Sequence, residues 1–114
     1  ARNAANGMDP TVQRALEYIG EHLDDPSLSV PQIAEAADVS VPHLSRIFKR
    51  DLNLTIVEHI NSLRIEKAKE LLLSSDITVQ KVAEATGYSN VVTFTRNFKR
   101  YVGASPTEFR SLNK

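Results

Sequence analysis

The sequence contains no cysteine, and it has no long apolar run. The absence of cysteine excludes disulfides, thiolate chemistry and zinc-finger spacing, and it is typical of a reducing compartment. No apolar stretch approaches the roughly 20 residues that a membrane-spanning helix needs, and no signal-peptide pattern is present. Apolar and charged residues make up 41% and 25% of the 114 residues, as in ordinary globular proteins. The composition indicates one small folded domain, or two very small ones that share a core.

The sequence also lacks a net charge, because 14 basic residues balance 14 acidic ones, whereas a nucleic-acid-binding domain is usually basic. The charges are unevenly distributed. Residues 1–45 carry two basic and seven acidic residues, a net charge of −5. Residues 46–114 carry the other twelve basic and seven acidic residues, a net charge of +5. Distribution decides whether a basic face exists, so the neutral total lowers the expected non-specific affinity for DNA without excluding DNA binding.

The residue groupings that enzymes and metal sites use are absent. The three histidines, His22, His43 and His59, lie far apart in the sequence, and none has a carboxylate at metal-ligand spacing. There is no glycine-rich phosphate loop and no nucleophile elbow. We therefore predict no catalytic residue, metal or cofactor, and we do not expect an enzyme.

One pattern, by contrast, occurs twice. Residues 30–36 (VPQIAEA) correspond to residues 79–85 (VQKVAEA), at an offset of 49 positions. Residues 44–50 (LSRIFKR) correspond to residues 94–100 (FTRNFKR), at an offset of 50. Each copy reads as a helix, a short turn and a second helix that ends in a basic pair. This pattern is typical of a helix-turn-helix, which lays its second helix in the major groove of DNA.

Helix-start residues, apolar spacing and helix breakers predict an all-α chain of about seven helices, because no stretch alternates for long enough to form a strand. The expected helices cover residues 10–23, 29–37, 42–52, 55–73, 78–86, 90–101 and 105–112. Val41 is interpreted as the cap of the third helix, since the residue before Pro42 is biased against helical geometry. Phe109 and Leu112 are expected on the buried side of the last helix.

The two copies are expected to form two helix-turn-helix subdomains joined by a long linker helix. Residues 9–54 would form the first subdomain, residues 55–74 the linker helix and residues 75–114 the second subdomain, after a linker over residues 1–8. A helix of about 19 residues spans close to 30 Å. Successive major grooves on one face of DNA lie roughly 34 Å apart. The linker helix therefore has about the length needed to separate two recognition helices.

The specific residues of the second copy carry a family resemblance. The most informative segment runs from Ala83 to Arg110 and includes Gly87-Tyr88, Gly103 and Ser105-Pro106. Together with the first copy and the run 64–72 (RIEKAKELL), it makes residues 10–112 resemble the DNA-binding domain of the AraC/XylS family of bacterial transcription regulators. The resemblance implies a transcription factor that binds an asymmetric site through two adjacent major grooves.

Three positions depart from the usual family pattern. Asn53 stands where the family often has glycine, Ile56 where proline is frequent, and His59 where tyrosine or phenylalanine is usual. Asparagine also tolerates left-handed backbone geometry, so the turn at Asn53 is expected to be retained.

Candidate base-reading residues lie on the second helix of each copy. In the first copy they are Pro42, His43, Ser45 and Arg46, and in the second they are Val91, Val92, Thr93, Thr95 and Arg96. Arg46 and Arg96 are the best candidates, because a guanidinium can bond both acceptors of guanine at once. The alternative for each arginine is a phosphate contact or a carboxylate partner. Val91 and Val92 could contact thymine methyl groups, or one of them could pack in the core.

Candidate phosphate contacts are the basic pairs and the helix starts. Basic side chains late on the second helices suit phosphate contact, and helix starts offer backbone amides. These candidates are Ser29, Ser40, Lys49, Arg50, Thr78, Asn90, Lys99 and Arg100. Their alternative roles are solvated surface charges and simple helix caps. Arg64, midway along the long helix, is expected to be structural rather than DNA-reading.

The sequence thus predicts sequence-specific binding of double-stranded DNA by a bacterial, cytoplasmic, nucleoid-associated regulator without membrane contact. The expected partners besides DNA are RNA polymerase, as for an activator, and a regulatory or sensor domain outside this sequence. The alternative is a protein-interaction module with the same fold and weak or no DNA binding. The acidic first part and the zero net charge favour that alternative.

Overall fold

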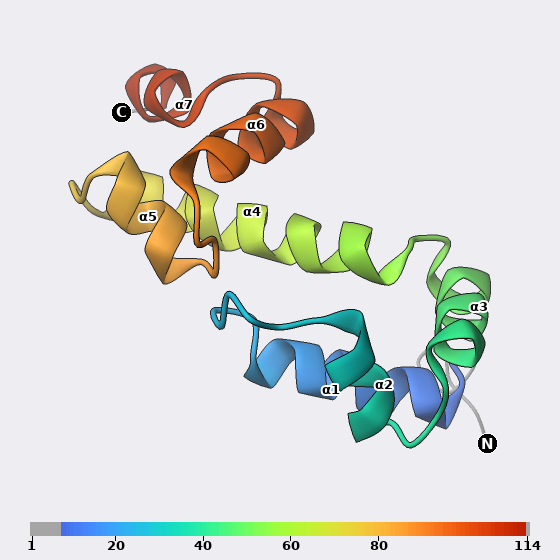
Figure 1. The fold of residues 1–114 in the computed structure, drawn as a ribbon. Coiled ribbons are helices and arrows are strands. Elements are labelled where there is room, and N and C mark those ends of the chain that lie inside the picture. Colours follow the sequence, from blue (N-terminus) through green and yellow to red (C-terminus); the bar gives the residue numbers. More distant parts are fainter. Residues whose placement is uncertain (1–7, 114) are drawn as a thin grey trace. The chain divides into compact units, whose positions relative to one another are not determined.

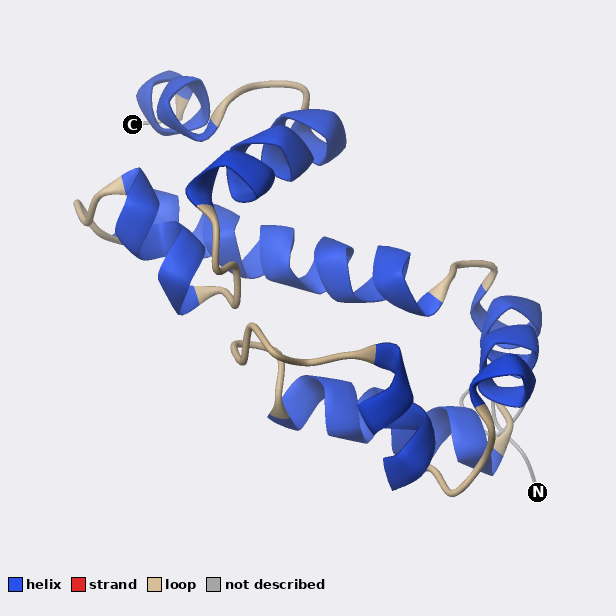
Figure 2. Cartoon of the chain, in the orientation of Figure 1, coloured by secondary structure: helices blue, strands red, loops and turns tan. Residues whose placement is uncertain are grey.

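The computed structural model describes residues 8–113 and, over that range, contains seven α-helices and no strand (Figures 1 and 2). The helices are α1 (Pro10–Glu21), α2 (Val30–Ala36), α3 (Val41–Leu52), α4 (Ile56–Ser74), α5 (Val79–Ala85), α6 (Val91–Val102) and α7 (Pro106–Leu112). The predicted all-α architecture is confirmed. Of the linker predicted for residues 1–8, all but Met8 lies outside the described residues.

Contacts divide the chain into two compact units. The first unit holds residues up to His22 together with Ser27–Ile60, and the second holds Leu23–Pro26 together with the chain from Asn61 onward. Helix α4 therefore contributes its first turns to the first unit and the rest to the second. Each unit contains one of the two sequence copies, as α2–α3 and as α5–α6.

Side-chain caps fix where the helices begin. Thr55 and Glu58 form a reciprocal pair at the start of α4, and Ser105 and Glu108 form the matching pair at α7. The cap of α3 is Ser40, whose hydroxyl accepts a hydrogen bond from the His43 amide, so the prediction of Val41 as cap is wrong. Valine has no side-chain acceptor for the free amides, whereas serine has one.

The core of the first unit is built from the apolar faces of α1, α2, α3 and the start of α4. Its buried apolar residues are Val12, Ala15, Ile19, Ile33, Ala34, Ala37, Leu44, Ile47, Phe48, Ile56 and Ile60. Helix α1 ends at Glu21, with His22 as its cap, which is earlier than the predicted end at residue 23.

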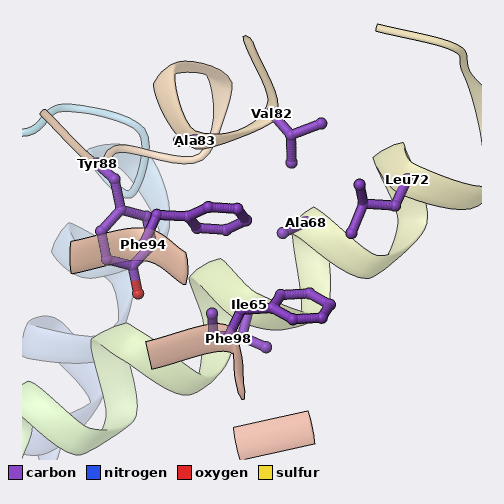
Figure 3. Close-up of a cluster of buried hydrophobic side chains, with 8 residues drawn as sticks. All are labelled: Ile65, Ala68, Leu72, Val82, Ala83, Tyr88, Phe94 and Phe98. Carbon is purple, nitrogen blue, oxygen red and sulfur yellow. The ribbon is translucent and has the colours of Figure 1, made fainter. Parts of the chain in front are cut away.

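The core of the second unit lies between α4, α5 and α6. Figure 3 shows Ile65, Ala68 and Leu72 on α4 beside Phe94 and Phe98 on α6. The other buried members of this cluster are Val82, Ala83 and Tyr88.

Two apolar side chains were predicted to be buried on α7, and they differ in their exposure to solvent. Phe109 packs against this cluster, but Leu112 is 78% exposed, so its predicted burial is wrong. Pro106, at the first residue of α7, is also buried, whereas Leu112 is the last residue of that helix.

The repeat seen in the sequence continues into the turns that end α3 and α6. Asn53 and Gly103, 50 positions apart, both adopt left-handed geometry, with φ of 59° and 90°. The amide of each donates to the carbonyl of the lysine four residues earlier, Lys49 or Lys99, at 2.8 Å. The expectation that Asn53 retains this turn is confirmed, because asparagine is one of the few residues that tolerate this geometry.

Candidate nucleic-acid interface

Helix α3 has one buried face and one exposed face. Leu44, Ile47 and Phe48 are buried, and these side chains fix the rotation of the helix about its axis. The opposite side carries four of the predicted DNA-contacting residues, which are all exposed: Pro42, Ser45, Arg46 and Lys49. A surface of this kind can enter a groove without disturbing the core.

The predicted base-reading residues His43 and Arg46 contact each other on this face. A terminal guanidinium nitrogen of Arg46 lies 2.9 Å from Nδ1 of His43, one helical turn earlier. Arg46 donates this bond, so Nδ1 of His43 is the acceptor in this arrangement. The arginine is thereby held over the exposed surface of α3 and keeps other N–H donors for a ligand.

Helix α6 repeats this division. Asn90 caps the helix by accepting bonds from the amides of Val92 and Thr93, and Phe94 and Phe98 face the core. Arg96 is exposed, and the predicted base-reading residues Thr93 and Thr95 are half-buried. The exposed side chains of this face give α6 an apolar first turn and a basic last turn.

The two valines at the start of α6 are both at the surface. Val91 is 36% exposed and Val92 is 65% exposed, so neither is a core residue. The geometry favours the first of the two interpretations, contact with a ligand, over packing in the core.

The basic pairs at the ends of α3 and α6 have different surroundings. Arg50 donates to Oδ1 of Asp51 at 2.7 Å and lies 3.5 Å from Oδ2 of Asp9. This guanidinium is the main reason that the pKa of Asp51 lies below its usual value. Arg100, the counterpart of Arg50, instead lies 5.9 Å from the centroid of the Tyr101 ring. Asp51 and Asp9 would therefore compete with a DNA phosphate for Arg50, whereas the neighbour of Arg100 is an aromatic ring.

The helix-start residues that were candidate phosphate contacts all act as caps. The hydroxyls of Ser29, Ser40 and Thr78 accept from the amides of Gln32, His43 and Lys81. Capping leaves at most the first amide of α2, α3 and α6 for a ligand, because Pro31 and Pro42 have no N–H and Asn90 bonds two amides of α6. Of the basic candidates, Lys49 and Lys99 are exposed.

Arg64 is structural, as predicted, and the way it is held was not foreseen. It is 8% exposed, its Nε donates to the carbonyl of Leu23 at 2.9 Å, and a terminal nitrogen donates to the carbonyl of Asp25 at 3.0 Å. Its guanidinium also lies 5.6 Å from the centroid of the Tyr88 ring. Burial lowers the pKa of Arg64, and its electrostatic interactions with Tyr88, Asp25 and Asp24 oppose that shift.

A cavity of about 250 Å³ adjoins Arg64 in the second unit, and sequence reasoning missed it. Its walls include Arg64, Gly87, Tyr88 and the beginning of α6. The hydroxyl of Tyr88 donates to the side-chain oxygen of Asn61 at 3.0 Å along its edge. No sequence pattern indicated that these residues meet, because Asn61 and Arg64 are 26 and 23 positions from Gly87.

Among residues 8–113, no group of three or more histidine, cysteine, aspartate or glutamate residues is arranged to hold a metal ion. None of the described helices is long and apolar enough to cross a membrane.

Comparison with known proteins agrees with this geometry. A family profile described as "Helix-turn-helix domain" matches residues 33–111. The arabinose operon regulatory protein of Escherichia coli is 33% identical over 104 residues, which cover 91% of this chain and 36% of that protein. The HTH-type transcriptional regulator YfiF of Bacillus subtilis is 38% identical over 97 residues, which cover 85% of this chain and 30% of that protein. The chain thus spans about a third of the length of these curated relatives.

Solved structures share the fold. The C-terminal domain of AraT, a response regulator from Geobacillus stearothermophilus, superposes with a TM-score of 0.89 at 35% identity, covering 92% of this chain and 87% of that chain. The DNA-binding domain of AdpA, solved in complex with a target DNA, gives a TM-score of 0.85 at 25% identity, covering 91% and 93% of the two chains. With its duplicated helix-turn-helix, the chain belongs to the AraC/XylS family of DNA-binding transcription regulators.

Proposed function

We propose that this chain is the sequence-specific, double-stranded DNA-binding part of a bacterial transcription regulator, with α3 and α6 as its two recognition helices. One observation carries the proposal. Each recognition helix buries an aliphatic or aromatic face and presents an exposed arginine, Arg46 or Arg96, followed by an exposed basic pair. A guanidinium one turn before two phosphate-binding cations is suited to base reading with backbone anchoring.

The residues divide by role in this proposal. Arg46 and Arg96 read guanine, Val91 and Val92 contact thymine methyl groups, and Lys49, Lys99 and Arg100 contact phosphates. The other residues that the sequence predicts to read bases or to contact phosphates keep those roles in this proposal. The helix-turn-helix subdomains of residues 9–54 and 75–114, joined through residues 55–74, would each occupy one of two successive major grooves.

We propose partners other than DNA from the family of the chain and from the share of its relatives that it covers. Because the chain spans only about a third of its curated relatives, we propose that a regulatory or sensor domain accompanies it in the whole protein. An activator role, with contact to RNA polymerase, is proposed from the operon regulators among its relatives. A regulator of chromosomal DNA in bacteria acts in the cytoplasm, at the nucleoid.

The test of this proposal separates base contacts from phosphate contacts. Arg96→Ala should weaken binding to the preferred duplex by about 1–3 kcal/mol and relax the preference at one base pair. Lys99→Ala should lower the affinity for all duplexes alike and reduce the salt dependence by about one unit. Fluorescence anisotropy with single-base-pair variants of the duplex measures both effects. An equal loss for every sequence in the Arg96→Ala variant would make Arg96 a phosphate contact.

A second candidate function is a protein-interaction module with weak or no DNA binding. The zero net charge favours it, as does the pairing of Arg50 with Asp51 and Asp9, which withdraws one cation from the proposed DNA face. The two functions differ in salt dependence, because phosphate binding releases counterions. Partner binding that does not change with salt, with no affinity for any duplex, would favour the interaction module.

A further inference from the structure

The cavity beside α6 is lined mostly by polar side chains, and the charged residue among them is a cation. Six of its lining side chains are neutral amides or hydroxyls, and one is a cation; these are Asn61, Tyr88, Ser89, Asn90, Thr93, Asn97 and Arg64. No aspartate or glutamate is among the described residues that line it. The carboxylates of Asp24 and Asp25 act on Arg64 from outside the lining. Toward the cavity, the positive charge of Arg64 therefore faces only neutral groups.

The buried guanidinium of Arg64 has more N–H donors than the hydrogen bonds that it makes within the second unit. A guanidinium has five N–H donors, and the carbonyls of Leu23 and Asp25 each receive a bond from Arg64. A buried charge is costly unless an opposite charge or further hydrogen bonds compensate it. The first turn of α6, which begins at the cavity with Asn90, adds the positive end of a twelve-residue helix, while Asn90 itself bonds the amides of Val92 and Thr93.

The arrangement is also rigid. Arg64 is fixed by two carbonyls and the Tyr88 ring, and Tyr88 is fixed by its bond to Asn61. A Cβ at Gly87 would lie 2.7 Å from Nε of Arg64, so only glycine lets the turn approach the guanidinium this closely. A rigid site with fixed donors binds an anion without a large ordering cost.

We propose that this cavity is an anion-binding site that takes one phosphate group through Arg64, Asn61 and the start of α6. Two sources could supply that group: the DNA backbone beside the second recognition helix, or a small free phosphate compound. Thr93 lines the cavity and also belongs to the proposed base-reading set, which places the site at the edge of the proposed DNA face. The DNA source rests on the proposed function, whereas the free source does not.

The first experiment is a titration of the native chain with inorganic phosphate, at ionic strength held constant with sodium chloride. Amide chemical shifts are followed by nuclear magnetic resonance. Saturable shifts confined to residues around the cavity are expected.

The key variant is Asn61→Asp. Its carboxylate still accepts the bond from the Tyr88 hydroxyl but places a negative charge beside Arg64, so phosphate affinity should fall about tenfold or more. Gln80→Glu on the exposed surface of α5 makes the same change of charge away from the cavity and should leave the phosphate titration unchanged. Thermal unfolding checks that the fold is kept, and Asn97→Asp at another lining position serves if Asn61→Asp lowers Tm.

The second experiment identifies the source. Single methylphosphonate substitutions remove the charge of one backbone phosphate at a time from a bound duplex. One position should weaken binding by native chain and by Gln80→Glu, but not further in Asn61→Asp, if the DNA backbone supplies the group. Saturable phosphate binding with no such position assigns the site to a free phosphate compound.

The proposal is overturned if phosphate causes no saturable shift at the cavity and no methylphosphonate position is coupled to residue 61. Failure of the chain to bind any duplex would remove the DNA source and the proposed function together. The phosphate titration would then still decide whether the cavity binds an anion.

Discussion

The ring of His59 packs edge-on against the ring of Phe48, with centroids 5.6 Å apart and an interplanar angle of 68°. Phe109 packs edge-on against Phe98 in the second unit, at 5.6 Å and 71°. Both members of the second pair lie 50 positions after those of the first. The repeat therefore extends beyond the recognition helices into the helices that follow them, and an imidazole occupies in the first unit the place of a phenyl ring in the second.

This imidazole should make stability depend on pH. Burial lowers the pKa of His59 below its usual value of about 6.5. The unfolded chain then binds a proton at higher pH than the folded chain does. The stabilising contribution of the neutral ring is thus fully present above about pH 6.5 and is lost as the pH falls through the lower, folded-state pKa.

His59→Phe should remove this dependence and raise the free energy of unfolding by about 1 kcal/mol, the size of an aromatic pair interaction. Urea unfolding at about pH 8 and about pH 5 measures both effects. His22→Phe, at a histidine that stacks on Tyr18 instead, is the control. An unchanged difference between the two pH values in His59→Phe would contradict the assignment to His59.

Two glycines with similar backbone geometry should respond very differently to alanine. Gly87 and Gly103 have φ of 98° and 90°, so both substitutions introduce backbone strain. At Gly103 a Cβ meets nothing within 4 Å, but at Gly87 it would lie 2.5 Å from the carbonyl oxygen of Leu23. Gly103→Ala should cost about 1 kcal/mol, and Gly87→Ala about 3 kcal/mol or more. Equal losses in urea unfolding would show that strain alone, and not the contact with the Arg64 region, requires Gly87.

The two basic pairs should contribute unequally to binding of DNA. Arg100→Ala should reduce the slope of log affinity against log salt by about one unit, as for a lost phosphate contact. Arg50→Ala should reduce it less, because Asp51 and Asp9 already bond this guanidinium. When Asp51→Asn is also present, Arg50→Ala should reduce the slope by an amount closer to that of Arg100→Ala. Identical slopes for the two arginine variants would mean that the carboxylates release Arg50 when DNA binds.

The last helix offers a paired test of its packing. Phe109→Ala should destabilise the chain by about 3 kcal/mol, because this ring packs against the second core and contacts Phe98. Leu112→Ala should change stability by less than about 0.5 kcal/mol, since this leucine is 78% exposed. Thermal unfolding compares the two. A large loss for Leu112→Ala would show that this residue is covered in solution.

Much of the fold was predictable because local signals and tertiary packing agree. The duplicated pattern, the cap residues and the apolar spacing predicted all seven helices, and they also predicted a structural role for Arg64. The errors at Val41 and Leu112 have physical causes. A side-chain acceptor at Ser40 outweighs the bias imposed by Pro42, and periodicity gives the direction of a side chain but not where the neighbouring core ends.

The parts of the site that escaped prediction depend on residues far apart in the sequence. The cavity forms because Arg64, Asn61 and the Gly87-Tyr88 turn meet in the second unit. The asymmetry between Arg50 and Arg100 arises because Asp9, 41 positions earlier, reaches the end of α3. No local pattern carries such information.

Selection of bound duplexes from a random DNA library at near-physiological salt shows whether both recognition helices read bases. Native chain should enrich two different half-motifs about one helical turn, roughly 34 Å, apart. Arg46→Ala should degrade one half-motif, and Arg96→Ala the other. Enrichment of one motif alone would mean that only one helix reads bases, and no enrichment at all would mean that neither does.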